Sequence, residues 1–188
     1  CLGYKGIFIK KYFEKLLSSN KKYSKLNIIF AKTGINTSTG TRIKKIKKFI
    51  KTDYFLLTYG DGVSKLNIKT LVQHHLNSKK IITFTAVRPP ARFGEVKFFN
   101  NSNKIKSFEE KNKIDAGWIN GGFFVINKDF FKYIPSRDVM LEKYPMNKVL
   151  KLNKMGAFKY SGFWHCVDSK RDLDKLQNII KKKTQKFE

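Results

Sequence analysis

The stretch Tyr54-Phe55-Leu56-Leu57-Thr58-Tyr59-Gly60-Asp61-Gly62-Val63 is the strongest fold signal in the chain. Its apolar half has the length of a strand and no polar alternation, which is typical of a buried parallel strand in an α/β sheet. Ligands of such sheets bind beyond the carboxyl ends of the strands, where Asp61 would lie. A tight Gly-Asp-Gly turn with no further role fits these residues equally well.

Composition indicates a single globular domain over residues 1–188. Hydrophobic residues make up 41% of the 188, which suits a substantial core and not a disordered chain. No apolar run approaches the roughly 18 residues that a membrane-spanning helix needs. The two cysteines, Cys1 and Cys166, form neither a disulfide framework nor a metal quartet. We therefore expect a cytoplasmic protein with reduced thiols and no membrane partner.

The net charge of +26 first suggests a nucleic-acid ligand. Only five of the 40 basic residues are arginine, however, and the lysines are scattered through nearly every segment. A surface that reads bases favours arginine, because its guanidinium makes bidentate contacts. We therefore expect no specific nucleic-acid partner, although a non-specific, salt-sensitive affinity for polyanions follows from the charge.

Helical and strand patterns alternate along the chain. Two strand patterns flank the polar run 100–103 and predict a hairpin. The alternation predicts an α/β fold, a three-layer α/β/α sandwich with a mixed, mainly parallel sheet. Helices are expected at 6–17, 43–50, 66–75, 130–134, 140–152 and 172–183, and strands at 26–31, 54–58, 80–87, 94–99, 104–109, 118–127 and 157–160.

Polar groups gather at the ends of several of these elements. The loop 33–42 is rich in hydroxyls and leads into a helix, which suits either a phosphate ligand or an ordinary helix cap. Asp61 is a suitable Mg²⁺ ligand, because Mg²⁺ takes one or two protein carboxylates together with phosphates. Lys111 follows a predicted strand and offers a point charge for a phosphate. Asp168 is either a second metal ligand or part of the cap of the last helix.

A nucleophile site has less support than a metal-and-phosphate site. His74 and His75 lie within a predicted helix and have no acid or cysteine partner nearby in the sequence, so we interpret them as surface or packing residues. No Ser-His-Asp or Cys-His arrangement has the sequence context that such sites require.

Taken together, six segments resemble the glucose-1-phosphate cytidylyltransferases of the sugar-phosphate nucleotidyltransferase superfamily. The resemblance covers essentially the whole chain, and the order of the segments makes it specific although each one is short. The segments are Thr33-Gly34 through Thr39-Gly40-Thr41-Arg42, Tyr59-Gly60-Asp61-Gly62, Pro90-Ala91-Arg92-Phe93-Gly94, Phe108-Glu109-Glu110-Lys111, Ile119-Asn120-Gly121-Gly122-Phe123-Phe124-Val125, and Gly162-Phe163-Trp164 with Asp168 through Asp172.

The resemblance implies a nucleotide-diphospho-sugar transferase fold that converts CTP and α-D-glucose 1-phosphate into CDP-glucose and pyrophosphate with Mg²⁺. Asp61 and Asp168 would be the metal carboxylates, and Lys111 would hold the sugar phosphate as the third catalytic residue. The implied substrate-binding residues are Thr37, Arg42, Gly60, Asn120, Gly121 and Gly122. The resemblance further implies a homo-oligomer that passes its product to a CDP-glucose 4,6-dehydratase for deoxysugar, O-antigen and lipopolysaccharide synthesis.

Two departures from the family pattern are visible in the sequence. Thr41 stands where the family usually has a second glycine, and residues 1–188 contain neither the family's first strand nor its Gly-Gly-x-Gly-Thr-Arg loop. That loop cradles the triphosphate, so the sequence alone predicts a truncated chain that cannot catalyse by itself. The alternatives are a non-catalytic nucleotide-sugar-binding relative, a thymidylyl or uridylyl transferase, and a basic polyanion-binding protein.

Overall fold

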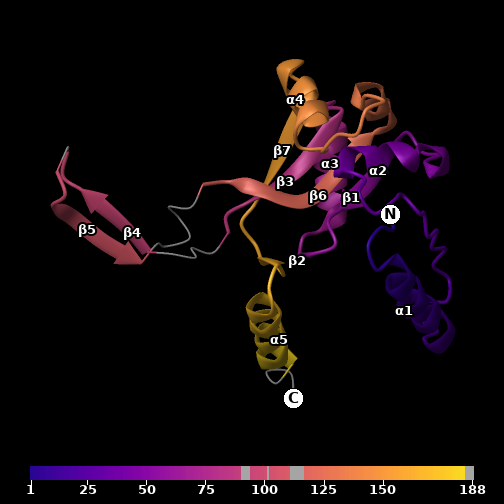
Figure 1. Ribbon diagram of the computed structural model, residues 1–188, viewed down its shortest axis with the longest axis horizontal. Helices are drawn as coiled ribbons and strands as arrows, with labels where there is room; N and C mark the ends of the chain where they lie inside the picture. The colour runs from indigo at the N-terminus through magenta and orange to yellow at the C-terminus, as the bar shows by residue number, and fades with distance from the viewer. Residues whose placement is uncertain (90–93, 101, 111–116, 185–188) are drawn as a thin grey trace. The chain divides into compact units, whose positions relative to one another are not determined.

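The computed structural model describes residues 1–89, 94–100, 102–110 and 117–184 (Figure 1). None of the helices within these ranges has both the length and the apolar character that crossing a membrane requires. The helices are α1 (Gly6–Ser19), α2 (Thr39–Lys45), α3 (Ile68–Ser78), α4 (Tyr144–Lys151) and α5 (Lys170–Thr184), with 3-10 turns η1 (Lys47–Phe49) and η2 (Lys128–Tyr133). The strands are β1 (Tyr54–Thr58), β2 (Gly62–Ser64), β3 (Ile82–Val87), β4 (Gly94–Phe98), β5 (Ile105–Glu110), β6 (Ile119–Asn127), β7 (Met155–Tyr160) and β8 (Trp164–Cys166).

The predicted α/β class with a mixed sheet is confirmed. A four-stranded sheet has the order β1-β6-β3-β7, in which β3 and β6 are antiparallel. Leu2 and Lys32 form a parallel bridge outside the named strands. Antiparallel pairing is more extensive than the sequence predicted. The strands β2 and β8 form a second antiparallel pair, and β4 and β5 form a third. The β4–β5 pair is the predicted hairpin.

The chain divides into two compact units, which we describe separately. The first comprises Cys1–Phe55 and Asn127–Met155, and the second comprises Leu56–Ile126 and Gly156–Glu188. In the first unit, Phe55 stacks on Phe131 with ring centroids 5.6 Å apart. The buried apolar side chains of this unit come mainly from α2, η2 and α4: Ile43, Phe130, Phe131, Ile134, Leu141, Met146 and Val149.

The strand predicted at 26–31 does not form. Residues 26–31 are irregular, and the adjacent Lys32 pairs only with Leu2 in the isolated bridge. A single bridge leaves most of the β-prone run without a strand neighbour, and Leu26 and Ile29 are accordingly exposed. The hydrophobic pattern was therefore present, but the described residues supply no partner strand for it.

In the second unit, β3 and β6 are the inner strands of the sheet; β3 is buried at all but one position, and β6 is buried over most of residues 121–126. Leu71 of α3 is fully buried, as are Ile82, Val125 and Ile126. The interpretation of residues 54–58 as a buried strand was wrong in part. β1 is at one end of the sheet order, and Leu56 is 52% exposed, because an edge strand has a neighbour on only one side.

Several boundaries differ from those expected from the sequence. The helix expected at 43–50 begins at Thr39, ends at Lys45 and is followed by η1, whereas the helix expected at 140–152 begins only at Tyr144, with Pro145 in its first turn. Pro at this position is favourable because no hydrogen bond is lost. Residues 130–134, expected to be helical, belong to the 3-10 turn η2 and its end. The short strands β2 and β8 were not predicted.

His75 links α3 to β3 and gives the fold a pH dependence. Its Nδ1 lies 2.8 Å from Thr83 Oγ1, and both side chains are buried. Burial, and secondarily the nearby His74, lowers the pKa of His75 below its ordinary value of 6.5. The unfolded chain therefore binds the proton more readily than the folded chain, and protonation favours unfolding.

We expect the melting temperature of the protein to fall as the pH drops from about 7.5 to about 5.5, through and below the ordinary pKa of histidine. In the His75→Gln variant, which keeps a polar side chain, the part of this fall that belongs to His75 should disappear. The measurement is thermal unfolding followed by circular dichroism at several pH values. Equal pH dependence in the two proteins would show that His75 does not contribute.

Candidate functional site

Asp61 lies in the turn that joins β1 to β2, and β8 fixes this turn from one side. Gly62 pairs with Cys166, and Ser64 pairs with Trp164. The Asp61 carbonyl accepts a hydrogen bond of 2.9 Å from the Val167 amide, and Ser64 Oγ donates one of 3.0 Å to the Phe163 carbonyl. The backbone of Asp61 is therefore held against the segment that carries Asp168.

β6 fixes the same turn from another side. The Tyr59 amide donates to the Gly122 carbonyl at 3.2 Å, and Asn120 Nδ2 donates to the Tyr59 hydroxyl at 3.1 Å. Asn120 Oδ1 in turn accepts from the Gly122 amide. Gly122 has a φ of +79°, and a Cβ on it would lie 2.6 Å from Tyr59 Cδ2. The Asn120-Gly121-Gly122 segment thus positions the residues that precede Asp61.

Trp164 connects β8 to β6. Its indole N–H donates a 2.8 Å hydrogen bond to the Gly121 carbonyl. Gly121 must remain a glycine for a steric reason, because a Cβ would lie 2.8 Å from Val87 Cγ1 and 3.0 Å from the Thr85 carbonyl oxygen. From the sequence, Trp164 was recognised only as part of a motif. An indole is a hydrogen-bond donor that usually finds a partner when partly buried, and this is the signal that could have revealed its role.

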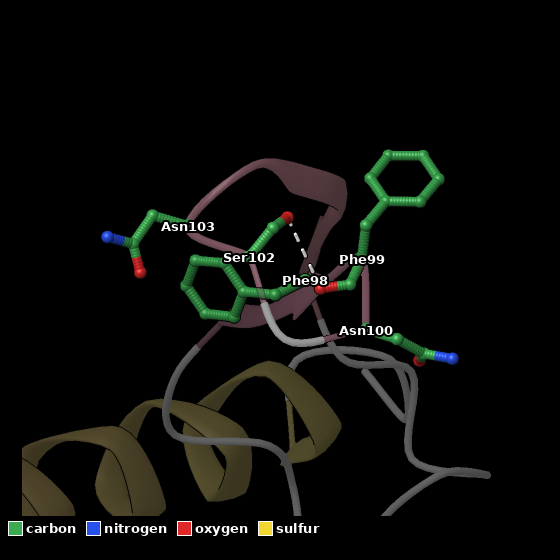
Figure 2. A pocket seen from close by; sticks show the side chains of 5 residues that line it. All are labelled: Phe98, Phe99, Asn100, Ser102 and Asn103. Atoms are coloured by element: carbon green, nitrogen blue, oxygen red, sulfur yellow. Dashed lines mark hydrogen bonds between the residues drawn. The ribbon is translucent and has the colours of Figure 1, made fainter.

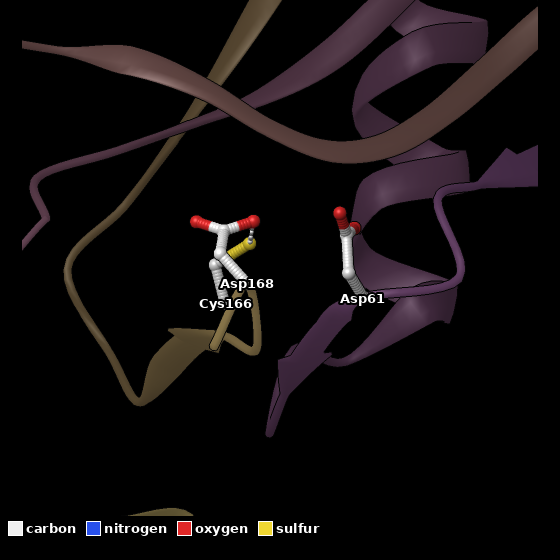
Figure 3. Close-up of side chains that lie close together, drawn as sticks. All are labelled: Asp61, Cys166 and Asp168. Atoms are coloured by element: carbon white, nitrogen blue, oxygen red, sulfur yellow. Dashed lines mark hydrogen bonds between the residues drawn. The ribbon is translucent and has the colours of Figure 1, made fainter. Parts of the chain in front are cut away.

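Asp61, Cys166 and Asp168 form a cluster at the end of this framework (Figure 3). One ligand atom from each residue lies within 4.8 Å of those of the other two, although Asp61 and Asp168 are more than a hundred positions apart in the sequence. Both aspartates are exposed, and Cys166 is partly buried and donates its thiol hydrogen to Asp168 Oδ1 at 3.4 Å. The structure thus brings the two carboxylates together, and Cys166, which no sequence pattern had assigned to the site, lies beside them.

The donor set of this cluster fits a divalent cation. Mg²⁺ is usually bound by one or two protein carboxylates, and this cluster offers two. Phosphate and water oxygens complete the coordination of the ion. Their exposure leaves room for these further ligands. Sulfur is a poor ligand for Mg²⁺, so Asp61 and Asp168 alone would hold this ion.

The hydroxyl-rich loop 33–42 belongs to the first unit, and its side chains have partners within that unit. Thr37 Oγ1 donates to the Thr33 carbonyl at 2.7 Å. Ser38 donates both its hydroxyl and its amide to Asp138, which lowers the pKa of that carboxyl. Thr39 donates its hydroxyl to Glu142 at 3.1 Å, and the Val139 amide donates to Thr41 Oγ1 at 2.9 Å. These contacts anchor the beginning of α2 to residues 138–142.

Arg42 lies at the centre of the first unit's contacts around Leu2. Its guanidinium donates to Thr33 Oγ1 at 2.6 Å and to the Ile35 carbonyl at 3.0 Å, and more weakly to the Leu2 carbonyl at 3.4 Å. A Cβ on Gly3 would lie only 2.7 Å from one guanidinium nitrogen. Arg42 therefore orders this part of the chain, and its role in substrate binding stays a prediction, as does that of Thr37.

Two further predicted site residues are Lys111 and Gly60. Lys111 lies outside the described residues, as do Arg92 and Phe93 of the family motif. Gly60 has nothing within 4 Å of the position where a Cβ would be. Open space at this position is compatible with close approach of a ligand beside Asp61, which stays a prediction.

A hollow of about 680 Å³ opens at the tip of the β4–β5 hairpin (Figure 2). It is lined by Phe98, Phe99, Asn100, Ser102 and Asn103, and the two phenylalanine rings point away from each other. None of these five side chains carries a charge. The carboxylate cluster is therefore the better candidate for phosphate chemistry.

Comparison with known proteins shows the family of this chain. The sequence profile described as nucleotidyl transferase matches residues 8–183. The glucose-1-phosphate cytidylyltransferase of Salmonella typhimurium is 34% identical over 97% of this chain and 77% of its own length. The probable glucose-1-phosphate cytidylyltransferase of Bacillus subtilis is 34% identical over 92% of this chain and 73% of its own length.

A solved structure shows the same fold at lower identity. HddC from Yersinia pseudotuberculosis, complexed with GMP-PN, superposes with a TM-score of 0.62 at 22% identity, covering 93% of this chain and 74% of that chain. Because the profile spans most of the sequence and two relatives are about one-third identical over nearly all of it, the chain belongs to the nucleotidyl transferase family, among relatives that are glucose-1-phosphate cytidylyltransferases.

Proposed function

We propose that the protein transfers the cytidylyl group of CTP to α-D-glucose 1-phosphate, giving CDP-glucose and pyrophosphate. The observation that carries this proposal is the convergence of Asp61 and Asp168 at one end of β2 and β8. The relatives named glucose-1-phosphate cytidylyltransferase supply the choice of nucleotide and sugar.

The reaction needs positioning and charge neutralisation and no covalent enzyme intermediate. An oxygen of glucose 1-phosphate forms a bond to the α-phosphorus of CTP, and the bond from this phosphorus to the bridging oxygen of pyrophosphate breaks. The attacking phosphate oxygen is already ionised, so no general base is required. Mg²⁺, held by Asp61 and Asp168, would neutralise charge on the α-phosphate and on the departing pyrophosphate.

The protein's other residues then have binding and positioning roles. Lys111 would pair with the phosphate of glucose 1-phosphate as a cation. Gly60 would let the substrate approach the turn beside Asp61, and Thr37 and Arg42 would serve the nucleotide side. Asn120, Gly121 and Gly122 would border the sugar, while the carbonyls of Gly122 and Gly121 accept hydrogen bonds from Tyr59 and Trp164 and hold them in place.

The cellular role follows from the product. CDP-glucose made in the cytoplasm would be the substrate of a CDP-glucose 4,6-dehydratase and would supply deoxysugars for surface polysaccharides such as the O-antigen of lipopolysaccharide. A homo-oligomeric enzyme is the expected form.

The test is the initial rate of pyrophosphate release by the full-length gene product with glucose 1-phosphate and Mg²⁺, compared among CTP, UTP, dTTP and GTP. We expect CTP to be preferred. Preference for UTP or dTTP would move the protein to the uridylyl or thymidylyl relatives. Binding of CTP without pyrophosphate release would favour a non-catalytic nucleotide-sugar-binding protein.

A further inference from the structure

We propose that Cys166 makes this site a binding site for thiophilic divalent cations, such as Co²⁺, Zn²⁺ and Cd²⁺, which Asp61, Cys166 and Asp168 would ligate together. The inference deepens the proposed function, because it rests on the metal-binding role assigned there to the two aspartates. It adds a sulfur ligand to the two carboxylates. This third ligand changes which metal ions the site prefers.

The backbone holds Cys166 in register with the aspartates. Cys166 pairs directly with Gly62, the residue that follows Asp61, and no side chain on Gly62 occupies the space opposite it. The Val167 amide, between Cys166 and Asp168, donates to the Asp61 carbonyl. The sulfur is therefore placed by the same β2–β8 pairing that places the two carboxylates, and a chance approach of a mobile side chain does not account for it.

The spacing is close to that of a bound ion. A zinc ion lies about 2.0–2.2 Å from carboxylate oxygens and about 2.3 Å from sulfur, so at tetrahedral angles two of its ligand atoms are about 3.3–3.7 Å apart. The three ligand atoms here lie within 4.8 Å of one another, and both aspartate side chains are exposed. Small rotations of these side chains bring all three atoms within reach of one cation.

The chemistry of the ligands then separates two classes of cation. Mg²⁺ is hard and binds oxygen, so it would be held by the two aspartates and would not be bound by the sulfur of Cys166, which contacts Asp168 Oδ1. Co²⁺, Zn²⁺ and Cd²⁺ accept thiolate, and binding replaces the thiol proton, which passes to solvent, with a metal–sulfur bond. Thiophilic ions would thus compete with Mg²⁺ for the same site and bind more tightly to it.

The experiment is a titration of the protein with Co²⁺, followed by the near-ultraviolet charge-transfer absorption that a cobalt–thiolate bond produces. We expect this band in the unmodified protein and its loss in Cys166→Ser. Cys1→Ser is the matched control for the remaining thiol and should retain the band. Asp61→Asn and Asp168→Asn should each weaken Co²⁺ binding by at least about tenfold.

Inhibition by Zn²⁺ gives a second measurement. With Mg²⁺ present, the Zn²⁺ concentration that halves the rate should rise at least about tenfold in Cys166→Ser, with circular dichroism as the check that this variant is folded. A cobalt band that survives in Cys166→Ser, or that is absent from the unmodified protein, would overturn the inference even if CDP-glucose is formed. A band that needs Cys166 and both aspartates, in a protein that forms no CDP-glucose, would instead leave the metal site standing and refute the proposed function.

Discussion

Replacement of Asp61 by asparagine is expected to lower kcat/KM for CDP-glucose formation by about a thousandfold. An amide keeps the size of the side chain but removes the charge that would hold the cation beside the α-phosphate. Loss of metal-ion stabilisation of the transition state costs several kcal/mol, and each 1.36 kcal/mol corresponds to a factor of about ten in rate. The turn itself should remain intact, because Asp61 is tied to Val167 through its carbonyl oxygen and not through its carboxylate.

Asp168→Asn should show a loss of similar size, and the double variant should be little worse than either single one, because the two carboxylates act on the same ion. Asp129→Asn is the matched control. Asp129 is a surface residue of η2 that forms an ion pair with Lys132, so its replacement should leave the rate unchanged. Steady-state kinetics with circular dichroism as a check of folding make the comparison. Near-normal activity in Asp61→Asn would contradict the assigned role.

Gly122→Ala is expected to destabilise the protein by about 2–4 kcal/mol. The residue has a φ of +79°, a conformation that costs a side-chain-bearing residue free energy, and the new Cβ would lie 2.6 Å from Tyr59 Cδ2. Tyr59 cannot move away without loss, because its ring packs edge-on against Phe124 and its hydroxyl accepts from Asn120. The free energy of unfolding from urea titration measures the effect.

Gly60→Ala is the control for this change, since it makes the same substitution in the same region. Nothing lies within 4 Å of the position of its Cβ, and Gly60 is not among the glycines with positive φ. We expect its stability to change by less than about 0.5 kcal/mol, as is usual for a substitution away from packed features. Equal destabilisation in the two variants would show that the positive φ of Gly122 and its contact with Tyr59 do not cause the loss of stability.

The sequence led to the α/β class, the hairpin and the position of Asp61 because these depend on local patterns. Alternating and continuous apolar runs predict strands, and glycines around an acid at a strand end indicate a site. The pairing of Asp61 with Asp168 followed from the order of the family's motifs. No local sequence pattern predicts that Asp61 and Asp168 lie close together, because their proximity depends on the β2–β8 pairing. Those two strands are too short to be recognised from periodicity.

Other features of the structure depend on neighbours that the sequence does not reveal. Leu56 looked buried because its neighbours are apolar, but β1 lies at the end of the sheet order. Arg42 was expected from the family resemblance to bind substrate, which stays a prediction; the contacts that the sequence did not reveal are those with Thr33 and two carbonyls of its own unit. Cys166 looked isolated in a chain with two cysteines and became a potential ligand only when the strands paired.

The most direct test of the shared carboxylate site is the binding of Mn²⁺, used as a paramagnetic substitute for Mg²⁺, in the presence of CTP. Electron paramagnetic resonance measures the free ion and therefore the affinity of the site. We predict a Mn²⁺ site that is weakened at least about tenfold by either Asp61→Asn or Asp168→Asn, with no further loss in the double variant. Unchanged affinity in both single variants, with folding intact, would contradict the claim that these two aspartates hold the catalytic metal.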